Sequence, residues 1–376
     1  MQPNSKIKIC HLSSVHKATD TRIFYKECRS LTAEYDVTLI AISATDYKKD
    51  GVNIIGLKQL KSRISRFLVT DFILFIKALK VNARLYHFHD PELIIIGLIL
   101  RLFGKKIIYD VHENVVADFD EKKWLPLKSL AKASYMFFEN LALRNFEIVL
   151  ADEAYLEQYK NRTGNFTIVQ NYVPVNDLKR EGHVYNTESN TIALVGYLSA
   201  RRGLPFILEA IYILKQRGIM IRLRCVGEKN EDVIKILNQS KVWPDIQEQV
   251  EFKGYIPFPD SLFAIEDCMA GLALLETLPN NQKSLSTKIF EYMAVGLPVI
   301  CSDFQVFKDI VEKYLCGLTA NPENPEAIAS VIETLYFDRN LASEMSKNAI
   351  MAVDNYSWKT EAEKLIDLYK NILKQN

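Results

Sequence analysis

The stretch NNQKSLSTKIFEYMAVGLPVICSD, residues 280–303, carries the clearest signal of the fold. It begins as a polar loop, continues as a helix that opens between Ser284 and Thr287, and passes through Gly296 and Pro298 into an apolar strand. A helix that leads directly into a continuous apolar strand is typical of parallel sheets covered by helices. The stretch therefore predicts an α/β fold with helix N-termini at the ends of its strands.

The same alternation of short β-branched runs and amphipathic segments extends over the whole chain and predicts two such sheets. For the first sheet we expect strands near Ile7–Leu12, Val37–Ile42, Arg84–Phe88, Lys106–Val111, Ile148–Leu150 and Thr167–Val169, and helices near 21–33, 66–80, 91–103 and 126–145. For the second we expect strands near Thr191–Val195, Ile221–Val226, Gln249–Phe252, Gly271–Leu275 and Pro298–Cys301, and helices near 204–217, 229–240, 284–295 and 325–353.

A polar segment without apolar periodicity, residues 171–190, separates the two blocks. We therefore predict an N-terminal Rossmann-like domain at 1–170, a linker at 171–190 and a C-terminal Rossmann-like domain at 191–356, and a length of 376 residues agrees with two domains. An amphipathic helix at 357–376 should cross back to the N-terminal domain. Ligands bind beyond the carboxyl ends of parallel strands, so we expect a cleft into which both domains face.

The composition is that of a soluble globular protein, with 48% hydrophobic and 25% charged residues. The N-terminal segment has no apolar run of signal-peptide length, and the longest apolar run, Leu93–Leu100, is about half of the ~20 residues that a membrane-spanning helix needs. The six cysteines show no paired metal or redox spacing, which indicates small core residues in a reducing compartment. We expect a cytoplasmic protein that touches a membrane only from its side.

The net charge of +1 is unevenly distributed, because residues 1–175 carry +6 and residues 176–376 carry −5. A basic half suggests an anionic partner. The segment 122–146 combines four lysines with large apolar side chains, as does a helix lying on an anionic bilayer, although a core-facing helix with a solvated lysine face explains it equally simply. No sustained basic and aromatic stripe is present, so we expect no nucleic-acid partner.

Phosphate chemistry is suggested by the helix start within 280–303. With 14 glycines in the chain, Gly-rich phosphate loops are scarce. The free backbone N–H groups and the helix dipole near Ser284, Ser286 and Thr287 suit a diphosphate instead. Lys288 adds a full positive charge, and Glu291 on the same face can accept hydrogen bonds from sugar hydroxyls. The plain alternative is a capped helix with a Lys–Glu surface pair.

A second strand–loop–helix unit, LVGYLSARRGLPFILEA at residues 194–210, carries two arginines directly before a glycine. Guanidinium groups at a strand's carboxyl end suit bidentate phosphate binding, so Arg201 and Arg202 are predicted donor-side residues. Taken alone, such a pair also fits a solvated turn.

These two units resemble the donor-binding half of the retaining, GT-B-fold glycosyltransferases of family four, and the order and spacing of motifs are similar over nearly the whole chain. The resemblance implies that Gly196 and Arg202 match the glycine and the basic residue that bind the donor diphosphate. Glu291 matches the second Glu of that family's Glu-x7-Glu motif, whereas Lys283 occupies the place of the first. Tyr197 stands where the family often has arginine, so Arg201 would supply that charge.

On the N-terminal side, the resemblance assigns Asp20 and Arg22, part of an Asp-x-Arg-Ile pattern, to acceptor binding. Their alternative roles are a helix N-cap and a helix-surface arginine. The resemblance places His112 against the donor sugar near its reacting carbon.

Five side chains near two strand ends could pass for metal ligands, namely His87, His89, Asp90, His112 and Glu113. The resemblance implies that no metal is required, because helix N-termini and basic side chains neutralise the leaving diphosphate. His89 and Asp90 are interpreted as a structural strand-end pair.

The function implied is transfer of a sugar, with retention, from a nucleotide-diphosphate sugar to a lipid-linked glycan acceptor in cell-surface polysaccharide biosynthesis, without a cofactor. His112, Arg202, Lys288 and Glu291 would be its catalytic residues. Two alternatives stay open. A nucleotide-sugar epimerase would use Asp110, His112 and Glu113 as acid and base, and a sugar-nucleotide-binding subunit without catalysis would explain Lys283.

Overall fold

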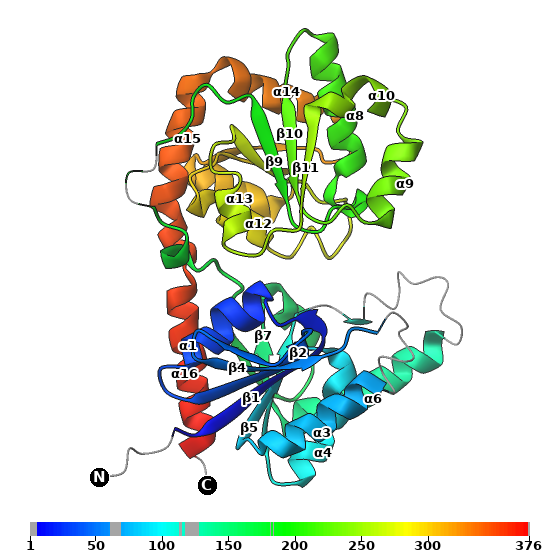
Figure 1. Cartoon of the computed structure of the whole chain (residues 1–376), viewed down its shortest axis with the longest axis vertical. Coiled ribbons are helices and arrows are strands. Elements are labelled where there is room, and N and C mark those ends of the chain that lie inside the picture. The colour runs from blue at the N-terminus through cyan, green and yellow to red at the C-terminus, as the bar shows by residue number, and fades with distance from the viewer. Residues whose placement is uncertain are drawn as a thin grey trace. The chain divides into compact units, whose positions relative to one another are not determined.

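The chain folds into two compact units, each built on one sheet (Figure 1). Unit 1 comprises Met1–Asn171 together with Trp358–Asn376, and unit 2 comprises Tyr172–Ser357. The structure, a computed structural model, describes residues 6–60, 69–112, 115–116, 128–180, 182 and 184–374.

Unit 1 contains an eight-stranded sheet of order β3-β4-β2-β1-β5-β6-β7-β8. Its strands are β1 (Lys8–Lys17), β2 (Asp36–Ile42), β3 (Tyr47–Lys49), β4 (Val52–Leu57), β5 (Leu85–Phe88), β6 (Lys106–Val111), β7 (Glu147–Leu150) and β8 (Asn165–Ile168). All neighbours pair in parallel except β3 and β4, which form a hairpin. Sequence analysis missed this hairpin, because its strands are short and its first strand, Tyr-Lys-Lys, has no apolar alternation.

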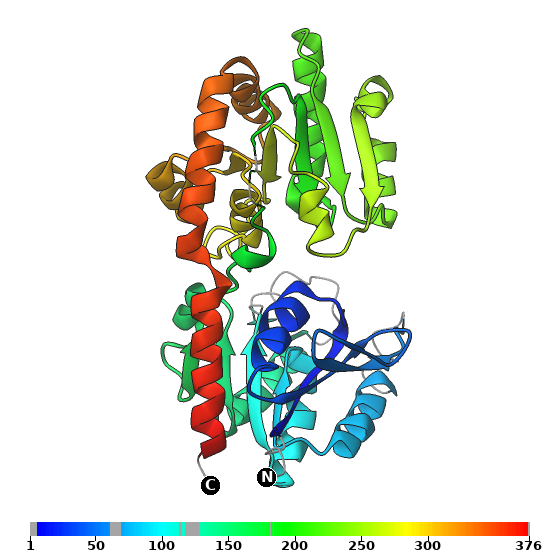
Figure 2. The same cartoon turned by 60° about the vertical axis from the view of Figure 1, so that its left-hand side comes forward.

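The helices of unit 1 cover both faces of this sheet. They are a π-helix, η1 (Thr21–Cys28), then α1 (Arg29–Leu31), α3 (Asp71–Val81), η3 (Pro91–Leu93), α4 (Ile94–Leu102), α6 (Lys128–Asn145), η4 (Glu153–Tyr155), α7 (Leu156–Tyr159) and α16 (Trp358–Lys374). Right-handed crossovers place α3, α4 and α6 on one face and η1 with α1 on the other. The terminal helix α16 packs against η1 and α1, as predicted for a helix that returns to the N-terminal domain (Figures 1 and 2).

Unit 2 contains a six-stranded, fully parallel sheet of order β11-β10-β9-β12-β13-β14. Its strands are β9 (Thr191–Val195), β10 (Arg222–Val226), β11 (Val250–Gly254), β12 (Ala270–Ala273), β13 (Val299–Ser302) and β14 (Gly317–Ala320). Its helices are η5 (Val175–Asp177), η6 (Ala200–Arg202), α8 (Leu204–Gln216), α9 (Glu231–Gln239), α10 (Trp243–Ile246), η7 (Gln247–Gln249), α11 (Asp260–Phe263), α12 (Thr287–Ala294), α13 (Gln305–Tyr314), α14 (Pro325–Phe337), α15 (Arg339–Ala352) and η8 (Val353–Tyr356).

Three features of unit 2 differ from the predicted elements. The single helix expected at 325–353 is two helices, because Asp338 leaves helical geometry and its carboxylate caps α15 at Leu341 N, 2.9 Å away. The helix α13 and the strand β14 were not predicted. The stretch expected as a linker lies in unit 2, where Val173, Val175, Leu178 and Tyr185 are buried.

Each sheet has a switch point, which is the place where the strand order reverses. It lies between β1 and β5 in unit 1 and between β9 and β12 in unit 2. Connections leave in opposite directions there, so the loops beyond the carboxyl ends diverge and leave room for a ligand. All six cysteines are buried, as predicted for core residues. None of the described helices combines the length and the apolar character needed to cross a bilayer.

Candidate functional site

At the switch point of unit 2, the loop after β9 lies against the first turn of α12. Gly196 has φ +112°, which favours glycine, and a Cβ added to it would lie 3.1 Å from Lys288 Cε. Its amide donates to Val226 O at 2.9 Å. The predicted donor residues Gly196 and Lys288, 92 positions apart in the sequence, are therefore neighbours.

Tyr292 fixes α12 in this position. Its hydroxyl accepts from Val195 N and donates to Leu272 O, both at 3.1 Å, and so joins the helix to β9 and to β12. A Cβ on Gly271 would lie 2.3 Å from the Tyr292 ring, so only glycine leaves space for this ring. Burial raises the pKa of Tyr292, which keeps the hydroxyl protonated and able to donate.

The predicted pair of Lys288 and Glu291 forms an ion pair along α12. The two side chains are 17% and 9% exposed, so the pair is more buried than a surface pair. Ser286 is the N-cap residue, but its side chain makes no capping hydrogen bond, and Ser284, Ser286 and Thr287 are half-buried. The start of α12 thus combines a cation, a carboxylate and a helix terminus that its own N-cap side chain does not close.

The two arginines lie in η6, between β9 and α8. The side chain of Arg201 is exposed and its carbonyl accepts from Glu276 N at 2.9 Å, which ties this loop to the loop after β12. Arg202 is half-buried, and among the described residues it has no hydrogen-bonded or ion-paired side-chain partner. Burial raises the pKa of Tyr292, and the positive charge of Arg202 partly opposes this rise. Arg202 therefore lies close enough to α12 to influence its electrostatics.

Some parts of this site were missed or differ from the family pattern. Gly227 follows β10, and a Cβ there would lie 2.0 Å from Gly196 O, so this second glycine is needed for the loop to close. Its sequence signal is a glycine directly after a strand. Tyr197, in place of an arginine, points its hydroxyl to Asp232 at 3.2 Å, and Lys283 is exposed.

At the switch point of unit 1, Asp110 at the end of β6 is the centre of a buried polar network. It accepts from Arg22 Nε at 3.0 Å and Arg22 Nη2 at 2.9 Å, and it also contacts His89 and His112. Burial acts to raise the pKa of Asp110, but the Arg22 guanidinium and His112 hold it well below its usual range. Asp110 is therefore a buried, ionised carboxylate.

The side chain of His112 is 16% exposed and lies at the outer edge of this network. Its Nε2 pairs with Asp110, and its carbonyl accepts from Tyr155 Oη at 2.6 Å. A carboxylate behind an imidazole orients the ring, which suits His112 for contact with a ligand. Glu113, considered with it in the sequence, lies outside the described residues.

The predicted acceptor residues have structural partners in unit 1. The Asp20 carboxylate caps η1 by accepting from Arg22 N at 2.9 Å and Ile23 N at 3.0 Å, which is the N-cap role considered for it. Arg22 is 4% exposed and also donates to Val169 O at 3.0 Å. It is thus a buried arginine rather than the helix-surface arginine of the alternative interpretation.

His89 and Asp90 do not pair with each other as expected. His89 bonds to His11 at 3.0 Å and to Asp110 at 3.2 Å, whereas Asp90 accepts from Ser14 N at 2.6 Å. The chain turns between these two residues, so their side chains serve different neighbours.

Sequence analysis also missed a pocket in unit 1. A cavity of about 970 Å³ lies beyond the carboxyl ends of β1, β2 and β4. Its lining mixes basic and polar side chains, among them Lys17, Lys58 and Thr19, with Asp46 and apolar side chains such as Leu57. The adjacency of Thr19 to Asp20 places this pocket beside the predicted acceptor loop.

In the segment predicted for membrane contact, residues 128–146 are described and 122–127 are not. The helix α6 exposes Leu130 at 66% and Phe137 at 60%, yet Ala142 and Leu143 are buried in the core. One stretch of this helix therefore packs inward and another presents apolar side chains to solvent, and contact with a membrane stays a prediction.

Comparison with known proteins finds similarity to sugar transferases. Residues 175–351 match the family described as "Glycosyl transferases group 1". Among curated proteins, the chain is similar to a D-inositol 3-phosphate glycosyltransferase of Corynebacterium urealyticum, with 23% identity over 49% of this chain and 43% of that protein. It is also similar to an amylovoran biosynthesis glycosyltransferase of Erwinia amylovora, with 26% identity over 38% of this chain and 34% of that protein. The matched stretches thus span less than half the length of either relative.

Solved structures share the fold over almost the entire chain. A sucrose-phosphate synthase from Thermosynechococcus elongatus gives a TM-score of 0.75 at 17% identity, covering 99% of this chain and all of that one. The Anabaena protein HepE, solved with UDP-glucose, gives 0.73 at 14% identity, covering 97% and 100%. The chain therefore has the GT-B fold, with two Rossmann-like units, and most of its second unit matches the model of the group 1 glycosyl transferases.

Proposed function

We propose that this GT-B chain, with its group 1 glycosyl transferase unit, moves a sugar from a nucleotide-diphosphate sugar to a glycan acceptor, with retention of configuration. One observation carries the proposal. Within the matched residues 175–351, Gly196, Lys288, Glu291 and the start of α12 converge at the switch point of the sheet. Such a site offers positive charge and backbone N–H groups to a diphosphate and a carboxylate to sugar hydroxyls.

The chemistry is mainly electrostatic. Lys288, Arg202 and the start of α12 stabilise the negative charge that develops on the diphosphate as the glycosidic bond breaks, and Arg201 adds to their field. Ser284, Ser286 and Thr287 bind the phosphate oxygens, and Glu291 orients the donor sugar while balancing the charge of Lys288. His112, held by Asp110, contacts the transferred sugar. The leaving phosphate accepts the acceptor proton, so neither a protein base nor a metal at the diphosphate is required.

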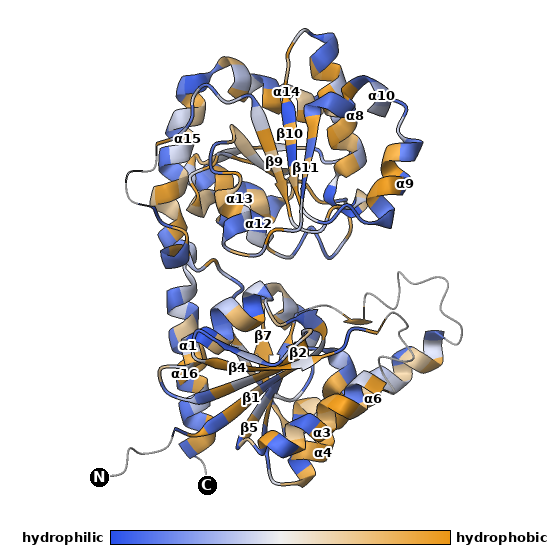
Figure 3. Cartoon of the chain, in the orientation of Figure 1, coloured by the Kyte–Doolittle hydropathy of each residue, from blue (hydrophilic) through white to orange (hydrophobic). Residues whose placement is uncertain are grey.

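The acceptor belongs to unit 1. The cavity beside Thr19, with Lys17 and Lys58 in its lining, suits a polar and anionic group, and Asp20 lies next to it. Apolar side chains exposed on α3, α4 and α6, among them Phe72, Leu102 and Phe137, make one face of unit 1 suited to a lipid surface (Figure 3). We infer a lipid-linked glycan acceptor reached at the inner face of the cytoplasmic membrane, in surface-polysaccharide biosynthesis.

The experiment measures nucleoside diphosphate release and product formation from a panel of nucleotide sugars beginning with UDP-glucose. The acceptor is a lipid-linked glycan, supplied in detergent or in vesicles that contain phosphatidylglycerol. We expect acceptor-dependent release that EDTA leaves unchanged and that is faster with the vesicles. Lys288→Ala should lower kcat/KM by about 10²–10³-fold, because one charge that stabilises the leaving group is lost. Lys235→Ala, an exposed lysine on α9, is the matched control and should leave the rate unchanged.

Each other outcome rejects the proposal in a defined way. Conversion of the nucleotide sugar without acceptor would indicate an epimerase. Tight donor binding without any product, with wild-type glycan assembly retained in cells that carry Lys288→Ala, would indicate a binding subunit without catalysis. Equal rates for Lys288→Ala and Lys235→Ala would remove Lys288 from the donor site.

A further inference from the structure

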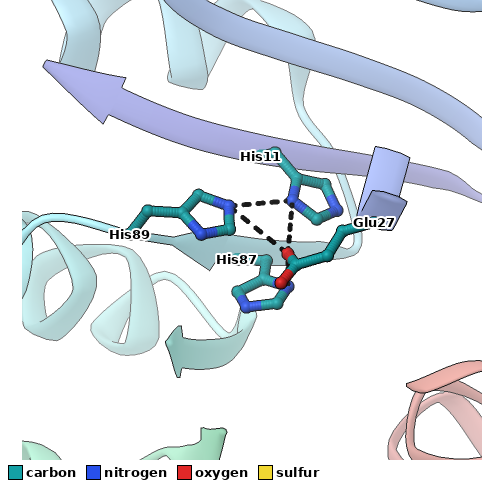
Figure 4. A group of neighbouring side chains, drawn as sticks. All are labelled: His11, Glu27, His87 and His89. Carbon is teal, nitrogen blue, oxygen red and sulfur yellow. Dashed lines mark hydrogen bonds and ion pairs between the residues drawn. The ribbon is translucent and has the colours of Figure 1, made fainter. Parts of the chain in front are cut away.

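Unit 1 contains a second group of polar side chains, deeper than His112, that the proposed transfer does not use. His11 on β1, His87 on β5, His89 just beyond β5 and Glu27 on η1 are buried and face one another (Figure 4). One ligand atom from each lies within 4.8 Å of all the others. Three imidazoles and a carboxylate are a ligand set typical of zinc sites in proteins.

The geometry of three of these atoms is close to that of a metal site. His11 Nδ1 and His89 Nε2 are 3.0 Å apart, and each lies 3.8 Å from Glu27 Oε2. The point equidistant from the three atoms lies about 2.1 Å from each, within the ~2.0–2.2 Å that zinc keeps to imidazole nitrogen and carboxylate oxygen. His87 belongs to the same group: its Nδ1 lies 3.9 Å from Glu27 Oε2 and 2.8 Å from Tyr369 Oη, and its buried Nε2 has no hydrogen bond among the described residues.

An independent observation is the unsatisfied state of Glu27. Its side chain is 0% exposed, yet neither carboxylate oxygen has a hydrogen bond among the described residues. Arg22 Nε is 3.0 Å from Glu27 Oε1, but that guanidinium already donates two hydrogen bonds to Asp110 and one to Val169. A buried carboxylate without hydrogen bonds is costly, and a cation between Glu27 and the histidines removes that cost.

The ring nitrogens of His11 and His89 that point away from the group bond to a hydroxyl and a carboxylate, as those of metal-binding histidines commonly do. His89 Nδ1 contacts Asp110 Oδ2 at 3.2 Å, so a carboxylate lies behind this imidazole, and His11 Nε2 contacts Tyr369 Oη on α16 at 3.0 Å. These contacts leave His89 Nε2 and His11 Nδ1 to face the centre of the group.

We propose that unit 1 binds one structural zinc ion through His11 Nδ1, His89 Nε2 and Glu27, with His87 as the fourth ligand. Asp110 is an outer partner, because its oxygens already serve Arg22, His89 and His112. The ion links β1, the end of β5 and η1, and Tyr369 connects it to α16. The inference is independent of the proposed transfer, because none of the four ligands has a role in that reaction.

The first test is the zinc content of the full chain, purified without a histidine tag and measured by inductively coupled plasma mass spectrometry. We expect about one zinc per chain, retained through dialysis against EDTA because the fully buried site opens only on unfolding. Chain refolded with ZnCl2 should have a Tm about 5 °C or more above that of chain produced and refolded without zinc, because zinc binds only the folded state.

Two variants separate this site from other buried carboxylates. Glu27→Gln should reduce the content to below about 0.1 zinc per chain and abolish the ZnCl2 effect on Tm. Glu139→Gln is the matched control, because Glu139 is equally buried in unit 1 but is satisfied by Tyr135 Oη at 2.8 Å, Tyr159 Oη at 2.9 Å and Arg162. It should retain the zinc.

Cobalt spectroscopy keeps the proposal testable if Glu27→Gln does not fold. Wild-type chain produced with CoCl2 should show the visible absorption of a tetrahedral site with nitrogen and oxygen ligands. Wild-type chain without bound zinc, without this absorption and without a ZnCl2 effect on Tm would overturn the proposal. Equal zinc content in Glu27→Gln and wild type would overturn it as well.

Discussion

The arginines near the switch points of the two sheets differ in whether their charge is paired within the protein. At the switch point of unit 1, Arg22 is 4% exposed, and its guanidinium donates two hydrogen bonds to the buried Asp110. At the switch point of unit 2, Arg202 is half-buried, and among the described residues its side chain has no such partner. A charge that the protein already satisfies contributes to the fold, whereas a charge left open is available to a ligand. The same strand-end position therefore stabilises one unit and, in the other, leaves a cation open where we propose the donor site.

The largest expected effect concerns the closed network of unit 1. Arg22→Ala leaves Asp110 buried without its cation, so we expect a loss of about 3–5 kcal/mol in the free energy of unfolding of unit 1. Lys179→Ala removes an exposed pair with Asp354, 2.8 Å apart, and should cost less than about 1 kcal/mol. Urea denaturation and calorimetry of the full-length chain measure both. A loss near 1 kcal/mol for Arg22→Ala would show that Arg22 is not needed for the fold.

Arg22→Lys sharpens the same comparison. Lysine restores the charge but not the planar fork that bonds Asp110 through two nitrogens. We expect stability between those of wild type and Arg22→Ala. A variant with full stability but weakened glycan transfer would instead support the acceptor role that the sequence suggested for Arg22.

A smaller effect is expected at Tyr292, whose hydroxyl joins α12 to β9 and β12 in the proposed donor site. Tyr292→Phe leaves Val195 N–H and Leu272 C=O without their partner, which should cost about 1–3 kcal/mol and loosen α12 against β9. Tyr185→Phe is the control in the same unit, because its hydroxyl donates a hydrogen bond to Met269 O at 2.7 Å, away from α12. Calorimetric titration with UDP-glucose should show weaker binding for Tyr292→Phe alone. Equal affinities in both variants would mean that Tyr292 serves stability without positioning Lys288.

The fold could be predicted from sequence because its signals are local. Apolar strands such as Val299–Ser302 and amphipathic helices such as Trp358–Lys374 carry their periodicity within one segment. The site proposed in unit 2 could be predicted for a similar reason, since Lys288, Glu291 and the helix start lie within one short segment.

The network of unit 1 is different, because its members come from five segments far apart in sequence. His11 and Asp110 lie in strands that read as apolar, and their interaction with Glu27, Arg22 and Tyr369 depends on sheet order and on the return of α16. The one available signal was polar residues within otherwise buried strands. That signal marks a network without identifying its partners.

The smallest effect tests whether the start of α12 is open to a ligand. The Ser286 side chain makes no capping hydrogen bond, so Ser286→Ala should change the free energy of unfolding by only a few tenths of a kcal/mol, whereas Ser caps normally contribute about 1 kcal/mol. Asn324 caps α14 through two hydrogen bonds, at 3.0 and 3.2 Å, and Asn324→Ala should cost about 1 kcal/mol. Affinity for UDP-glucose should show the reverse order, because only Ser286 is proposed to bind phosphate. If Ser286→Ala lost as much stability as Asn324→Ala and left the affinity unchanged, the helix start would be an ordinary cap and the contrast between the two units would rest on Arg202 and Lys288 alone.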